Sequence, residues 1–164
     1  PILLADAYFL DGRHADAIAQ INLRINETEG TEKLTAEGSL GYYLAKSGRI
    51  PEAVPIYSRL RSSLEASPQV VTDLVLIAYA IGRVDEGLQY FERSCKERRL
   101  PKLMFSFNPI WQDVRADKRV YDVLKRIEDS QSQEKARSSI FPSFRKYIPT
   151  SVSPALRRTK SETT

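Results

Sequence analysis

Apolar residues recur at intervals of three and four on both sides of Gly12, Gly48 and Gly82. Such intervals place the side chains on one face of a helix. The stripes before the glycines comprise Leu4, Tyr8 and Phe9, then Leu40, Tyr43 and Leu44, then Leu74, Ile77 and Ala78. The stripes after them comprise Ile18, Ile21 and Ile25, then Val54, Tyr57, Leu60 and Leu64, then Leu88, Phe91 and Cys95. The pattern predicts an all-α chain made of helix pairs.

Each glycine begins a unit of glycine, arginine, two variable residues, an acidic residue and a small residue. The first two glycines are 36 residues apart and the last two are 34 apart, close to the period of about 34 in helix-turn-helix repeats. Glycine can adopt the left-handed conformation that ends a helix. The small residues allow the paired helices to approach closely, and they are Ala17, Ala53 and Gly87. We therefore expect three helical hairpins that turn at the glycines.

In these glycine, small and aromatic positions, residues 1–99 resemble tetratricopeptide repeats. The resemblance implies hairpins stacked as a right-handed α-solenoid, with a truncated first hairpin because Pro1 falls inside its first helix. We expect that an earlier repeat precedes it in a longer chain. Gly41 occupies the close-approach position of the family. Gly38 does not, so we expect local weakness there.

Residues 100–128 depart from the repeat. An apolar connector is followed by renewed helical spacing, whose apolar stripe comprises Val120, Val123, Leu124 and Ile127. This stretch resembles the closing segment after tetratricopeptide arrays in multidomain bacterial signalling proteins, which implies a helix that caps the stack. Residues 129–164 are basic and rich in Ser, Thr and Pro, with too few apolar residues in phase for a core. We expect this tail to be largely disordered.

The composition excludes several classes of function but does not identify the function. The chain has 164 residues with a net charge of +4, but residues 129–164 hold 7 Lys and Arg against 3 Asp and Glu. The remainder is neutral, so we do not expect a nucleic-acid-binding surface. One cysteine, one histidine and the lack of a long apolar run exclude a disulfide framework, a multi-histidine metal site and a membrane span. We expect a cytoplasmic protein.

Neither of the residues suited to nucleophilic catalysis has a predicted partner. His14 and Cys95 lie on different repeats, and both are expected to pack against neighbouring helices. Residues 37–48 lack the Gly-Lys-Ser/Thr ending of a phosphate-binding loop. We therefore expect no enzyme activity, no cofactor and no metal.

The first helices of the hairpins should line the concave side of the stack, where a peptide or partner helix can bind. Aligning the three repeats places seven candidate partner-binding residues there: Asp6, Phe9, Tyr42, Lys46, Thr72, Leu76 and Tyr79. Family members that bind the carboxyl terminus of chaperones carry Lys, Asn and Arg at positions matching Ile2, Asp6, Ser39, Gln69 and Asp73. None of these side chains is cationic, and two carboxylates would repel such a ligand.

The sequence favours a protein-interaction scaffold, the regulatory segment of a larger signalling protein, that binds a peptide or helix in its groove. Two alternatives remain. The repeats could be a spacer or dimerisation element for a catalytic or DNA-binding domain, with the aromatic residues buried in self-association. The basic tail could also tether the chain to nucleic acid or an anionic membrane, through residues such as Arg157 and Arg158.

Overall fold

The computed structural model describes residues 2–140, and it describes the side chains of residues 4–101 and 104–135. Within this part the chain is helical throughout and has no strand. The elements are α1 (Ile2–Leu10), α2 (His14–Glu27), α3 (Gly30–Lys46), α4 (Ile50–Ser63), η1 (Pro68–Val70), α5 (Val71–Ala80), α6 (Val84–Lys96), α7 (Lys102–Phe107), η2 (Pro109–Trp111), α8 (Gln112–Ala116) and α9 (Lys118–Ile140). None of these helices combines the length and apolar character that crossing a bilayer requires. The chain divides into two units, residues 1–128 and 129–164.

The glycine turns form as predicted. Gly12, Gly48 and Gly82 have φ angles of 78°, 80° and 82°. At the first turn, the amide of Arg13 donates to the carbonyl of Tyr8 over 2.8 Å and that of Gly12 donates to Phe9 over 3.0 Å. Equivalent pairs of bonds close the other two turns. This arrangement satisfies the last carbonyls of the first helix and sends the chain back as the second.

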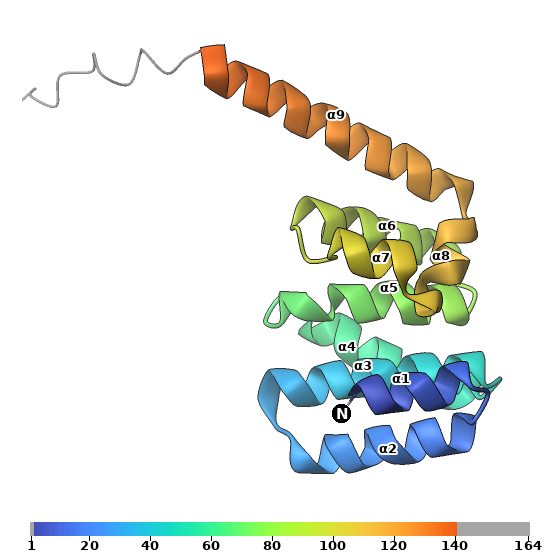
Figure 1. The fold of residues 1–164 in the computed structure, drawn as a ribbon. Coiled ribbons are helices and arrows are strands. Elements are labelled where there is room, and N and C mark those ends of the chain that lie inside the picture. The colour runs from blue at the N-terminus through green and yellow to red at the C-terminus, as the bar shows by residue number, and fades with distance from the viewer. Residues whose placement is uncertain (1, 141–164) are drawn as a thin grey trace, which may run out of the picture. The chain divides into compact units, whose positions relative to one another are not determined.

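The helix pairs pack in a stack. Helix α1 contacts α2, α3 contacts α4, and α5 contacts α6, while α3 also contacts α1, α2 and α5 (Figure 1). Ala17 and Ala53 are fully buried. A Cβ atom on Gly41 would lie 2.8 Å from Ile77 Cδ1, so this glycine allows α3 and α5 to approach closely. The first helices α1, α3 and α5 thereby form a continuous surface, here called the first-helix face.

A fourth turn of the same kind follows α6 without a glycine. Arg98 has a φ angle of 54°, and the amide of Arg99 donates to the carbonyl of Ser94 over 2.8 Å. The chain then enters residues 99–117, here called the closing segment, which includes α7, η2 and α8. Trp111 and Val114 of this segment are buried in the same core as the hairpins.

The last helix is longer than the sequence predicts. Val120 and Val123 are buried in the first unit, as expected for a closing helix. Helix α9 then continues to Ile140, so residues 129–140 are helical where disorder was expected. Charged and polar residues with high helix propensity, such as Glu134 and Lys135, allow the helix to extend without a buried face. The rest of the predicted tail, residues 141–164, lies outside the described residues.

Candidate functional site

The first-helix face contains a cavity of about 230 Å³ that is partly open to solvent. Helices α1, α3 and α5 form three of its walls, and residues 99–111 of the closing segment form the fourth. Of the seven predicted partner-binding residues, four line this cavity: Asp6, Tyr42, Thr72 and Leu76. Residues from three hairpins that are distant in sequence thus meet at one place.

The other three predicted residues have partners within the chain. Phe9 is 8% exposed, and its ring stacks on those of Tyr43 and His14 at centroid distances of 4.7 and 4.8 Å. Lys46 Nζ lies 2.7 Å from an oxygen of Asp113. The hydroxyl of Tyr79 donates to Asp117 over 3.0 Å. These three side chains therefore contact other residues of the chain and do not line the cavity.

The closing segment covers part of the first-helix face, which alignment of the repeats did not reveal. The hydroxyl of Tyr42 donates to the carbonyl of Ile110 over 3.2 Å. Arg115 donates to the carbonyls of Phe105 and Asn108, which fixes the bend between α7 and η2. Trp111 is 3% exposed and meets Phe105 edge to face. The part of the face around the cavity is partly open to solvent.

Gly38 has a packing role that the sequence analysis did not assign. A Cβ atom at this position would lie 2.5 Å from Cγ of Asp73. The missing side chain is therefore what allows the Asp73 carboxyl group to lie against α3, at the wall of the cavity. Gly38 is buried, and the missing side chain allows a close contact between α3 and α5.

The two carboxyl groups of the cavity have unusual environments. Asp6 accepts a short hydrogen bond from the hydroxyl of Tyr43, and burial raises the pKa of its carboxyl group. Burial also raises the pKa of Asp73 to about 8. Among the side chains that the structure describes, Asp73 makes no hydrogen bond or ion pair. Desolvation without a compensating cation disfavours the charged form of both groups.

The hydroxyl groups of the cavity are oriented by their own helices. Thr35 donates to the carbonyl of Thr31 over 3.1 Å, Ser39 donates to that of Thr35 over 3.4 Å, and Thr72 donates to that of Gln69 over 3.4 Å. Each hydroxyl proton is thus engaged by the backbone. The oxygen lone pairs are left as acceptors.

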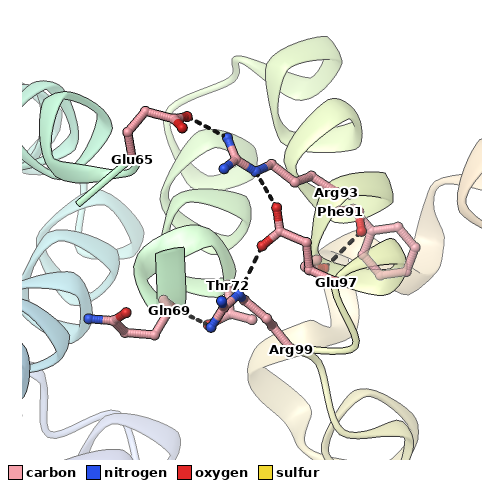
Figure 2. A network of polar contacts seen from close by, with 8 residues as sticks. Glu65, Gln69, Thr72, Phe91, Arg93, Glu97 and Arg99 are labelled. Atoms are coloured by element: carbon pink, nitrogen blue, oxygen red, sulfur yellow. Dashed lines mark hydrogen bonds and ion pairs between the residues drawn. The ribbon is translucent and has the colours of Figure 1, made fainter. Parts of the chain in front are cut away.

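A network of ion pairs positions the arginine at the edge of the cavity. Figure 2 shows Glu97 between Arg93 and Arg99. Its two oxygens lie 2.7 Å from Nε of Arg93 and 2.8 Å from Nε of Arg99, and Arg93 also contacts Glu65 over 2.9 Å. The pKa of Glu97 is lowered, first by the hydrogen bond from Arg93. The positive charge of Arg99 is therefore compensated by a carboxylate outside the cavity.

The described residues provide no arrangement suited to metal or thiol chemistry. No group of three or more His, Cys, Asp or Glu side chains in this part of the chain could hold a metal ion. Burial raises the pKa of the Cys95 thiol, which disfavours the nucleophilic thiolate. The arrangement of acceptors and aromatic rings in the cavity is suited to binding.

Comparison of the chain with protein-family models, with curated proteins and with solved structures finds no match. The function therefore has to be inferred from the contacts described above. The site whose geometry is most informative is the cavity formed by α1, α3, α5 and the closing segment.

Proposed function

We propose that this chain is a protein-interaction scaffold of tetratricopeptide-like hairpins that binds a partner protein on the first-helix face. The observation that supports the proposal is the cavity, which joins residues of α1, α3 and α5 into one accessible surface. Stacked helical hairpins commonly use such surfaces to bind extended segments of other proteins. The partner contacts the accessible part of the face, formed by Asp6, Ser39, Thr72, Asp73 and Leu76.

A bulky substitution at the cavity tests this proposal. Peptides are selected from a random display library against the wild-type protein, and each enriched peptide is measured with Ser39→Arg. We expect at least a tenfold loss of affinity, because the longer cationic side chain fills the cavity and alters its charge.

Ser62→Arg is the matched control. Ser62 lies on α4 outside the cavity, and it donates to the carbonyl four residues before it, as Ser39 does. Circular dichroism checks that both variants remain helical. The proposal is wrong if no peptide is enriched, or if Ser39→Arg and Ser62→Arg bind the selected peptides equally well.

Self-association is the second candidate, and an exposed aromatic residue on α7 favours it. Phe107 is 76% exposed and Met104, one turn earlier, is 46% exposed. A second copy could bury these side chains and gain apolar contact area. Sedimentation equilibrium tests this: a dimer that Phe107→Ser converts to monomer supports it, and a wild-type monomer at all concentrations excludes it.

A further inference from the structure

The polar lining of the cavity consists mainly of oxygen atoms that can accept hydrogen bonds, and the guanidinium group of Arg99 is the exception. We propose that the cavity binds the cationic end of a lysine or arginine side chain of the partner protein, an inference that rests on the proposed function. An ammonium group brings three donors and a guanidinium group brings five, and neither brings an acceptor. The cavity and the side chain are therefore complementary in hydrogen bonding.

The hydroxyl donors of the cavity are already used within the chain, and the Nε–H group of Arg99 is donated to Glu97. The hydroxyl protons of Tyr42 and Tyr43 are donated to Ile110 and Asp6. The hydroxyl protons of the cavity's threonine and serine side chains are donated to their own helices, and these residues are Thr35, Ser39 and Thr72. A ligand that needs donors from the protein would find few, whereas a ligand that supplies donors finds several oxygens.

The charges of the cavity favour the same ligand. Neither Asp6 nor Asp73 has a cationic partner among the described side chains, although both line the cavity. The nearby cations are compensated elsewhere, Arg99 by Glu97 and Lys46 by Asp113. A bound cation would therefore offset part of the cost of burying the ionised forms of the two carboxyl groups.

The size and walls of the cavity suit one long side chain. Its volume of about 230 Å³ is below the roughly 300–1,000 Å³ of pockets that enclose a drug-sized ligand. Leu76, Ile110 and Trp111 provide apolar surface for the methylene groups of lysine or arginine. The rings of Tyr42 and Trp111 also attract cations. Since no described group of three acidic or histidine side chains exists, an organic cation fits this site better than a metal ion.

The single tryptophan of the chain provides a direct measurement, because Trp111 lines the cavity. The probes are acetyl-Gly-Lys-Gly-amide, acetyl-Gly-Arg-Gly-amide and the corresponding norleucine peptide, whose side chain has the four carbons of lysine without the ammonium group. We expect a saturable change in tryptophan fluorescence with the two cationic peptides. Binding of the norleucine peptide should be at least about tenfold weaker, since charged hydrogen bonds are lost.

A double variant tests the two carboxylates. Asp6→Asn with Asp73→Asn keeps the shape of the cavity and prevents both groups from ionising. At pH 9, where the Asp73 carboxyl group is mostly ionised, we expect at least about a tenfold loss of affinity for the lysine peptide. The control is Glu27→Gln with Asp122→Asn, which removes two exposed carboxylates outside the cavity. Thermal unfolding checks that both variants fold.

The pH dependence adds a second measurement. Asp73 faces Asp6 from α1, Tyr42 and Tyr43 from α3, and Arg99 from the closing segment. Its pKa of about 8 means that a cation binds better once the proton is lost. Affinity for the lysine peptide should therefore increase between about pH 6 and pH 9, where lysine stays protonated. Asp73→Asn should abolish this increase.

The outcomes separate this inference from the proposed function. Equal binding of the lysine and norleucine peptides, or an unchanged affinity in the Asp6→Asn, Asp73→Asn variant, would overturn the inference. If peptides selected from the library still lose affinity with Ser39→Arg, the first-helix face binds a partner by other chemistry. If neither the tripeptides nor the selected peptides bind, both proposals fail.

Discussion

The two parts of the first-helix face differ in how their polar side chains are satisfied. In the covered part, Tyr42, Lys46 and Tyr79 each contact the backbone or a carboxylate of the closing segment. In the open part, Asp73 and Asp6 lie at a cavity without a cationic partner among the described residues. Aromatic and charged residues on one helix face can thus either contact other parts of the chain or remain available to bind a ligand. A side chain in the covered part has a hydrogen-bonding or ionic contact within the chain, whereas a carboxyl group in the open part has no cationic partner among the described side chains.

Removing the anchor of the closing segment should have the largest effect. Trp111 is 3% exposed and packs against Phe105, so Trp111→Ala leaves a large cavity and is expected to lower the free energy of unfolding by about 3–5 kcal/mol. Denaturant unfolding followed by circular dichroism measures this change. Trp111→Phe keeps an aromatic ring and should cost less. A loss below about 1 kcal/mol for Trp111→Ala would show that the segment does not depend on this contact.

Asp73→Asn should raise the free energy of unfolding, and the size of the increase should depend on pH. Burial raises the pKa of Asp73 from 3.8 to about 8, so the native state binds a proton that the unfolded state releases between these values. Stability from this group is complete below about pH 4 and is lost as the pH rises through 8. Asparagine carries no charge at any of these values. The variant should match the wild type near pH 4 and exceed it by about 1–3 kcal/mol above pH 8.

Subtracting the unfolding free energy of the wild type from that of Asp73→Asn at each pH gives the contribution of Asp73 alone. Glu52, Glu92, Glu97 and Asp117 have lowered pKa values, which give stability that is lost as the pH falls. These contributions are present in both proteins and cancel in the comparison. Denaturant unfolding at a series of pH values provides the measurement. Parallel curves for Asp73→Asn and the wild type would show that Asp73 is not desolvated.

The helix pairs could be predicted from sequence because their causes are local. Apolar spacing sets the buried face of each helix, and Gly12, Gly48 and Gly82 mark turns that need a positive φ angle. The same signal fails at the fourth turn, where Arg98 adopts the left-handed conformation. The second half of helix α9 is not predicted for a related reason, since residues 129–140 have no apolar period to detect.

The cavity could not be predicted in full, because it is formed by contacts between residues that are far apart in the sequence. Four of the residues that the repeat alignment places on the concave side line one cavity in the structure, and they are Asp6, Tyr42, Thr72 and Leu76. The alignment could not show that the closing segment folds back over the same face, because that contact joins residues 68 positions apart in the case of Tyr42 and Ile110. From the sequence, Asp73 is recognisable only as a residue that would repel a carboxylate ligand. The one feature of the sequence that indicates the close contact between α3 and Asp73 is Gly38, a glycine inside a helix.

The smallest effect concerns the ion pair at the border between the covered and open parts. Lys46 Nζ lies 2.7 Å from Asp113, but the two side chains are 34% and 47% exposed. Solvent screens such a pair, and ordering both side chains costs entropy, so a coupling energy of about 0.2–1 kcal/mol is expected. A double-mutant cycle with Lys46→Met and Asp113→Asn measures it by denaturant unfolding, and the coupling should decrease in high salt. A coupling well above this range would mean that the closing segment is held by charge as well as by Trp111, whereas a value near zero would leave packing and the Tyr42 hydrogen bond as what holds it on the first-helix face.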